Sequence, residues 1–277
     1  MFRCLNPGAI GVSLPWDQCL PLAKKHGFEG IDVNPDPAVP AAKITDALAR
    51  HGLKVGGTGL PVNLHGDDKA FDASIAALEP KAARAAEIGV TRFATWILPF
   101  SDTRPFKENF AWHVQRLGRA ARVLAGHKCR LGLEFIGPKT CRVGHKYPFV
   151  RTMEQMLELA EAVGPNVGLL LDAWHWYTSL GTVEDILALR QEQVVYVHIN
   201  DAPAGIAVDA QKDNVRCLPG ETGVVDLKGF LGALDKIGYD GPVVPEPFVK
   251  ELASLPGEES IRRVGEALRR IWPPCSG

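Results

Sequence analysis

The chain has 277 residues, 46% of them hydrophobic and 23% charged, and its formal net charge is −1 at pH 7. This is the composition of a globular protein, and its apolar runs are shorter than the roughly 20 residues that cross a bilayer, so no membrane segment is expected. A near-neutral charge without a long basic run argues against a nucleic-acid partner and favours a small molecule.

The amino-terminal residues and the cysteines both indicate a cytoplasmic protein. Asn6 and Pro7 interrupt any apolar core within residues 1–15, so we expect no secretory signal. The cysteines are dispersed and form no C-x-x-C pair, so we expect reduced thiols rather than disulfides. They are Cys4, Cys19, Cys129, Cys141, Cys217 and Cys275.

Short apolar runs alternate along the chain with longer segments of helical period, which is the pattern of repeated βα units. The predicted strands lie at residues 8–12, 28–34, 53–59, 90–97, 128–135, 166–172, 193–200 and 242–247. The predicted helices lie at residues 15–26, 40–51, 68–88, 106–126, 151–163, 182–190, 226–238 and 257–271. A chain of this length with these units predicts an α/β fold, a single (β/α)8 TIM-barrel domain over residues 1–277.

Glycine recurs where predicted helices meet the strands that follow them. Gly27, Gly52, Gly89 and Gly238 each stand directly before an apolar strand start, where glycine supplies the left-handed residue that ends a helix. The spacing is a weak internal repeat of about 30 to 40 residues, which suits sequential βα units better than a doubly wound sheet.

Two connections are longer than an ordinary βα loop. Residues 136–150 and 201–225 follow predicted strands and are rich in glycine, proline and charge. Both leave the carboxyl ends of strands, where barrel enzymes carry their chemistry, so we expect them to cover a substrate.

Ionisable residues stand at the ends of four predicted strands. They are Glu134, Asp172, His198 and Glu246. Singly, such a histidine is more often a hydrogen-bonded core residue, and such an aspartate often caps the following helix. Together they would lie at one end of a barrel, where burial and like charge are costly without a cation. Three carboxylates and an imidazole therefore predict a divalent-metal site.

Five passages carry a resemblance to a known family. They are Leu133-Glu134-Phe135, Leu171-Asp172-Ala173-Trp174-His175, Val197-His198-Ile199-Asn200-Asp201, Pro245-Glu246-Pro247, and the stretch from Arg216 through Pro219-Gly220-Glu221 to Gly223. With these passages the chain resembles the xylose isomerase-like TIM-barrel superfamily, in the branch of sugar and sugar-phosphate isomerases and epimerases that includes ketose 3-epimerases and inosose isomerases. The resemblance runs over nearly the whole chain and is strongest between residues 128 and 248.

The resemblance implies the composition of the site. It assigns Glu134, Asp172, His198 and Glu246 to one divalent ion, with manganese first and magnesium, cobalt or zinc as other choices. It makes Glu134 and Glu246 the groups that remove and return a proton, through an enediolate of a sugar, keto-sugar or inositol derivative. His175 and Arg216 match family residues that contact substrate oxygens, and the planar guanidinium of arginine suits that task.

The amino-terminal half gives weaker signals. Asn34 and Asn63 follow the second and third predicted strands, and Trp96 lies near the end of the fourth, so we expect all three to face the pocket and bind substrate. An aromatic residue such as Trp96 or Trp16 is as often a core or subunit contact. Cys129 and Cys141 have no ligand spacing and are left out of the site.

Other functions remain open at this point. A lyase or dehydratase would begin with the same proton abstraction. A DNA-repair enzyme similar to endonuclease IV would need extra histidines on the early strands, which carry Asn34, Asn63 and Trp96 instead. A noncatalytic scaffold with this fold would be expected to lack at least one of the four predicted metal ligands. A neutral substrate is favoured over a phosphorylated one, because the loops after the last strands lack a glycine-rich phosphate cradle. The resemblance leaves a homodimer or homotetramer open.

Overall fold

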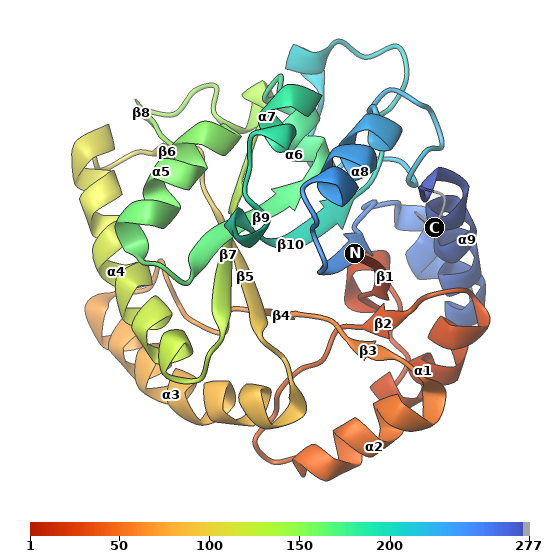
Figure 1. The fold of residues 1–277 in the computed structure, drawn as a ribbon. Coiled ribbons are helices and arrows are strands. Elements are labelled where there is room, and N and C mark those ends of the chain that lie inside the picture. Colours follow the sequence, from red (N-terminus) through yellow and green to blue (C-terminus); the bar gives the residue numbers. More distant parts are fainter. Residues whose placement is uncertain (274–277) are drawn as a thin grey trace.

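Strands and helices alternate along the chain in the computed structural model, which describes residues 1–273 (Figure 1). The strands are β1 (Phe2–Leu5), β2 (Gly30–Ile31), β3 (Lys54–Val55), β4 (Thr58–Gly59), β5 (Arg92–Ile97), β6 (Phe100–Ser101), β7 (Arg130–Phe135), β8 (Tyr147–Pro148), β9 (Val167–Asp172), β10 (Val194–Ile199) and β11 (Pro242–Pro245). The α-helices are α1 (Trp16–Lys25), α2 (Ala41–His51), α3 (Asp68–Ile88), α4 (Phe106–Gly126), α5 (Met153–Val163), α6 (Ala173–Thr178), α7 (Val183–Leu187), α8 (Leu227–Lys236) and α9 (Gly257–Ile271). Short 3-10 helices are η1 (Gly8–Ile10), η2 (Lys139–Cys141), η3 (Gln191–Gln193), η4 (Val208–Ala210) and η5 (Lys250–Ser254).

The parallel strands form one curled sheet in the order β3-β2-β1-β11-β10-β9-β7-β5-β4. The first and last members, β3 and β4, are consecutive pieces of the chain, so the sheet closes on itself with the longer helices outside it (Figure 1). This is the predicted TIM barrel, a single α/β domain. Residues 274–277 lie outside the described part, so the predicted boundary at 277 stays a prediction.

Helix ends follow the local chemistry that the sequence predicts. The Asp67 side chain accepts the Ala70 N–H at 2.7 Å and begins α3, because the first turn of a helix has N–H groups without backbone partners. Gly89, at φ 89°, ends the same helix in the left-handed conformation, as Gly52 does for α2 at φ 59°.

The prediction of the first strand at residues 8–12 is wrong. The strand is β1 (Phe2–Leu5), which pairs with β11 through Phe2 and Pro242, and residues 8–10 form η1 instead. Pro7 has no N–H to give to a sheet, and Gly11 has φ 72°, so this segment turns rather than extends. The sequence predicts no helix between residues 172 and 182, whereas the structure has α6 there, directly after β9.

The core has two parts. A large cluster of apolar side chains fills the space between the sheet and the helices. A small one lies inside the barrel and consists of Phe2, Cys4, Leu170, Tyr196 and Val244. The five cysteines within residues 1–273 are free, as predicted, whereas Cys275 lies outside the described residues. No helix of the described part is long and apolar enough to span a membrane.

Candidate metal centre

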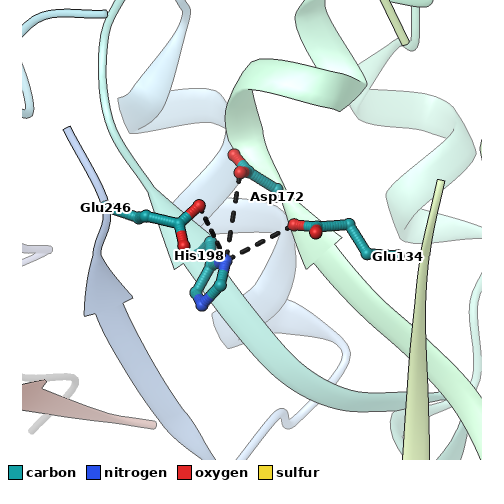
Figure 2. A group of neighbouring side chains, drawn as sticks. All are labelled: Glu134, Asp172, His198 and Glu246. Carbon is teal, nitrogen blue, oxygen red and sulfur yellow. Dashed lines mark ion pairs between the residues drawn. The ribbon is translucent and has the colours of Figure 1, made fainter. Parts of the chain in front are cut away.

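Four side chains from neighbouring strands converge at the carboxyl end of the barrel. Glu134 comes from β7, Asp172 ends β9, His198 lies in β10, and Glu246 follows β11 directly. Their ligand atoms all lie within 4.8 Å of one another. Figure 2 shows Glu134 and Glu246 on either side of His198, with Asp172 completing the group. Pairing of His198 with Asp172 in the sheet register brings these strand ends level.

The histidine ring faces the three carboxylates. His198 Nδ1 lies 3.3 Å from Oε2 of Glu246, 3.4 Å from Oε1 of Glu134 and 4.0 Å from Oδ2 of Asp172. Both His198 Nδ1 and Glu134 Oε1 are buried without a hydrogen-bond partner. Buried polar atoms without partners are costly, so this pair of atoms fits a ligand between them.

The donor set also fits a divalent ion. Carboxylate oxygens suit magnesium, manganese and calcium, and an imidazole nitrogen extends the range to zinc and other transition metals. Within residues 1–273 these four side chains could therefore hold one such ion.

The carboxyl groups of this centre do not ionise alike. Burial raises the pKa of Glu134 to about 7, although His198 pulls it down. Asp172 is also buried, but attraction to the positively charged Arg216, the largest of several favourable interactions, outweighs burial and holds its pKa at about 2. For Glu246, attraction to His198 outweighs burial and lowers the pKa. The pKa of His198 is raised well above its ordinary value, because the two glutamates outweigh burial.

Asp172 is held by groups on three sides. Its Oδ1 accepts the Trp174 N–H at 2.7 Å and the Asn200 amide at 3.0 Å, and its Oδ2 accepts from Arg216 Nη1 at 2.8 Å. Asn200 is fully buried. Asn200 belongs to one of the five family-like passages, but the sequence predicts no role for it. Its hydrogen bond to Oδ1 holds the Asp172 carboxylate in place.

Arg216 lies among carboxylates. Besides Asp172, its Nη1 reaches Oε2 of Glu246 at 3.2 Å, and its Nη2 donates to Oδ1 of Asp213 at 2.8 Å. Its Nε donates to the Asp213 carbonyl at 2.9 Å. The ring of Phe248 lies 4.4 Å from the guanidinium carbon. Each of the three guanidinium nitrogens of Arg216 therefore donates to at least one oxygen of Asp172, Asp213 or Glu246.

His175 is a neutral neighbour of this arginine. Its Nδ1 accepts the Gly137 N–H at 3.2 Å, and its Nε2 lies 3.3 Å from Nη2 of Arg216. Burial lowers the pKa of His175 to about 4, although Asp172 pulls it up. The ring therefore carries no charge at neutral pH.

Two cavities flank the converging side chains and share Trp96, Glu134 and Glu246 as walls. The first, of about 360 Å³, is also lined by Phe100, Cys141, His175, Asp213, Arg216 and Phe248. The second, of about 160 Å³, is also lined by Asn6, Asp32, Thr58, Thr95, Tyr196 and His198. A larger surface hollow of about 820 Å³ beside Trp112 and Arg116 has no contact with the four ligand candidates.

The amino-terminal candidates separate into two groups. Trp96, whose side chain is half-exposed, lines both cavities. Asn34 and Asn63 are exposed and line neither cavity. Cys141, which the sequence reasoning left out, lines the first cavity.

Asn6 and Asp32 were missed by the sequence reasoning. Asn6 follows β1 directly and Asp32 follows β2, so both obey the rule that polar residues at strand ends face the pocket. Asp32 accepts the Gly57 N–H at 2.8 Å and the Asn6 amide at 3.1 Å, and also accepts from the Tyr196 hydroxyl. The predicted first strand at residues 8–12 leaves Asn6 outside any strand end, and the predicted strand at residues 28–34 places Asp32 in its interior.

The two long loops are tied to the barrel and to each other. The buried Asp201 carboxylate accepts four backbone N–H groups, among them Thr222 at 3.0 Å and Gly223 at 2.8 Å, which fixes the loop that carries Arg216. Thr140 Oγ1 donates to the Gln211 carbonyl at 2.6 Å and joins residues 136–150 to residues 201–225. Their covering of a substrate stays a prediction.

Comparisons with known proteins agree with this architecture. The family model described as xylose isomerase-like TIM barrel matches residues 20–271. An inosose isomerase of Bacillus subtilis is 32% identical over 137 residues, which are 48% of this chain and 45% of that protein. A ketose 3-epimerase of Arthrobacter globiformis is 28% identical over 82% of this chain and 73% of its own length. A 3-dehydroshikimate dehydratase of Pseudomonas aeruginosa is 37% identical over 36% of this chain and 16% of that protein.

Solved structures give the same fold. A xylose isomerase domain protein from Alicyclobacillus acidocaldarius superposes with a TM-score of 0.85 and 31% identity, over 98% of both chains. The IOLI protein, solved with a zinc atom, superposes with a TM-score of 0.80 and 23% identity over 98% of both chains. The matched segment spans about half the length of the inosose isomerases.

Proposed function

Because the chain belongs to the family of xylose isomerase-like TIM barrels, we propose that it is a divalent-metal-dependent isomerase or epimerase of a sugar, keto-sugar or inositol derivative. The observation that carries the proposal is the convergence of Glu134, Asp172, His198 and Glu246 within 4.8 Å, beside two cavities. Similarity to an inosose isomerase and a ketose 3-epimerase supports the substrate class. We place the enzyme in the cytoplasm, as a homodimer or homotetramer.

In this proposal the four side chains hold one divalent ion. Manganese is our first choice, and the zinc atom of the structurally similar IOLI protein makes zinc a reasonable second, ahead of magnesium or cobalt. When bound, such an ion polarises a substrate carbonyl and stabilises negative charge on its oxygen.

The proton would be moved by the two glutamates. Both line the two cavities, from the separate strand ends of β7 and β11, so a substrate carbon between them has a carboxylate on each side. One glutamate removes the proton next to the carbonyl, which gives an enediolate, and the other returns a proton to the opposite face or the adjacent carbon.

His175, Arg216 and Trp96 would orient the substrate. All three line the first cavity, where neutral His175 and the ion-paired Arg216 would form the polar wall that a substrate hydroxyl contacts, and Trp96 offers an apolar face for a sugar ring. Asn34 and Asn63 would reach a substrate only from exposed loop positions.

A dehydratase is the second candidate, because the chain is similar to a 3-dehydroshikimate dehydratase and to inosose dehydratases. The same abstraction of a proton, followed by loss of the β-hydroxyl group as water, would give an unsaturated ketone. Identification of the product by mass spectrometry separates the two reactions, since an isomerase conserves mass and a dehydratase loses one water.

Incorporation of solvent deuterium tests the proposal. The protein is incubated in deuterium oxide with Mn²⁺ and a panel of ketoses and inososes, and carbon-bound deuterium is measured by mass spectrometry. We expect incorporation that is lost in Glu246→Gln and retained in Glu158→Gln, which changes an exposed glutamate of α5. Absence of deuterium with every substrate, or equal activity of Glu246→Gln and the parent, would contradict the proton-transfer role.

A further inference from the structure

Trp96 lines both cavities, yet no hydrogen bond within residues 1–273 fixes its side chain. Its partner in the sheet register is Glu134, so the indole leaves β5 on the same face as that ligand candidate. The side chain is half-exposed and needs support from outside the cavities. We propose that His65, an exposed histidine of the loop between β4 and α3, is a positioning residue that holds the Trp96 ring as a wall of both cavities. The inference rests on the proposed function and adds to it a residue outside the metal centre.

His65 lies in the middle of a stack of three rings. Its imidazole is 6.1 Å from the Trp96 ring, centroid to centroid, with the two planes at 26°. On its other side the Trp112 ring lies at 5.7 Å and 27°. Both distances are in the range of roughly 4.5 to 7 Å in which aromatic rings attract each other. His65 lines the surface hollow and neither of the two cavities, so it supports Trp96 from outside the site.

The loop that carries His65 is fastened on both sides of that residue. Arg116 Nη1 donates to the carbonyl oxygens of Leu64 and Gly66, each at 2.7 Å. Arg116 is buried on α4, and its guanidinium carbon lies 4.7 Å from the centre of the Trp112 ring, one turn earlier on the same helix. A buried guanidinium is costly to leave without partners, so these bonds keep the loop in one place. Arg116 therefore fixes both the backbone around His65 and the ring behind it.

The imidazole acts in this stack as a flat, uncharged ring. Partial burial, together with the charges of Arg104 and Arg116, lowers the pKa of His65 from its ordinary value, so the ring is mostly neutral at pH 7. Its nitrogens form no hydrogen bond with any residue that the structure describes, and its contacts are ring contacts. A phenylalanine at this position would keep a flat ring between the two tryptophans, whereas an alanine would leave a gap.

The expected consequence is a change in substrate affinity rather than in proton transfer. Glu134 and Glu246 line the two cavities, which His65 does not reach, so the groups that move the proton stay in place without it. Loss of a contact that binds substrate and transition state equally raises KM and leaves kcat unchanged. Because a stacked pair of rings changes an equilibrium by a few-fold, we expect an increase in KM of about 5-fold.

Exchange kinetics test this expectation in the Mn²⁺-reconstituted protein, with D-fructose and scyllo-inosose as probes. His65→Ala should raise the KM for deuterium exchange about 5-fold and leave kcat near that of the parent, and His65→Phe should restore the parental KM. Trp96→Ala should raise KM at least as much, and adding His65→Ala to it should cause no further loss, because the histidine acts through that ring. His51→Ala, at the end of α2 before β3, is the control and should behave as the parent does.

The indole N–H signal of Trp96 in a nuclear magnetic resonance spectrum reports on the same contact without a substrate. Trp96→Phe assigns the signal by its disappearance. We expect a sharp signal in the parent and in His65→Phe, and a shifted, broadened one in His65→Ala, whose thermal denaturation should match the parent because His65 is exposed.

The inference is wrong if the Trp96 signal is the same in His65→Ala and the parent, if His65→Ala keeps the parental KM, or if the losses in the double variant add. Absence of exchange by the parent with both ketones would count against the proposed function instead. A Trp96 signal that moves in His65→Ala and returns in His65→Phe would still show that His65 holds the ring.

Discussion

The two halves of the barrel differ in both regularity and chemistry. The barrel strands β7, β9, β10 and β11 run for four to six residues, and each carries an ionisable side chain at or next to its carboxyl end. From β2 to β4 each strand has two residues, and the pocket wall there carries Asn6 and Thr58, with Asp32 bound to its neighbours. In the proposed enzyme the carboxyl-terminal half therefore supplies the reactive groups, and the amino-terminal half shapes the space beside them.

The largest expected effect is the loss of deuterium exchange when an ionisable glutamate of the carboxyl-terminal half is replaced by an amide. Glu134→Gln and Glu246→Gln should each lower deuterium exchange about 10³-fold, because an amide cannot accept or return the proton. Steady-state exchange rates measure the loss. If a variant kept its exchange rate within a few-fold of the parent, that glutamate would not transfer the proton. The reactive groups would then not all lie in the carboxyl-terminal half.

Burial affects His113 differently from His198, because His113 has no carboxylate beside it. It is buried on α4, stacks on Phe149, and bonds through Nδ1 to the Asn109 carbonyl at 2.8 Å. Burial lowers the pKa of His113 from its ordinary 6.5 to about 4. Between those pH values the unfolded chain takes up a proton that the folded chain does not, so the free energy of unfolding falls as pH falls, by about 3 kcal/mol in total.

Chemical denaturation of the parent and of His113→Phe at pH 7, 5.5 and 4 measures this effect. The phenylalanine keeps the ring contacts and cannot titrate, so its stability should depend less on pH over this window. Equal pH dependence of the two proteins would show that His113 is not a source of acid sensitivity.

A smaller effect is expected from a residue that acts through a ligand candidate. Asn200→Ala removes the amide that holds Oδ1 of Asp172, and loss of such a supporting hydrogen bond lowers metal affinity about 10- to 100-fold. Titration with Mn²⁺, followed by electron paramagnetic resonance, measures the dissociation constant. Asn214→Ala, at an exposed position of the same loop region, is the matched control and should bind as the parent does.

The amino-terminal half should be sensitive to volume rather than charge. A Cβ at Gly57 would lie 2.4 Å from the ring of Tyr196, whereas one at Gly59 meets nothing within 4 Å. Gly57→Ala should therefore lower the free energy of unfolding by about 1 to 2 kcal/mol, and Gly59→Ala should leave it nearly unchanged. Thermal denaturation measures both. Equal stability of the pair would mean that Tyr196 adjusts freely and that the close packing is not required.

The two halves were also not equally predictable from the sequence. Where strands are long and apolar, as around Leu133 and Leu171, the pattern predicted the strand ends and all four converging side chains. In the amino-terminal half the strands are short, and nearby glycine and proline residues obscure the alternation of apolar and polar residues. The sequence therefore places the first strand after Pro7, and Asn6 is not predicted to line the pocket. The ion pairs of Arg216 could not be predicted either, because they depend on Asp213, which one sequence does not place beside Asp172.

Metal content tests the central claim most directly. The protein is stripped with a chelator, reconstituted with Mn²⁺, desalted and measured by plasma mass spectrometry, beside a double variant in which Asp172 and His198 are replaced by alanine. The account predicts one ion per chain in the parent and none in the variant, which circular dichroism should show to be folded. No bound ion in the parent, equal content in a folded variant, or three tightly held zinc ions per chain would contradict it.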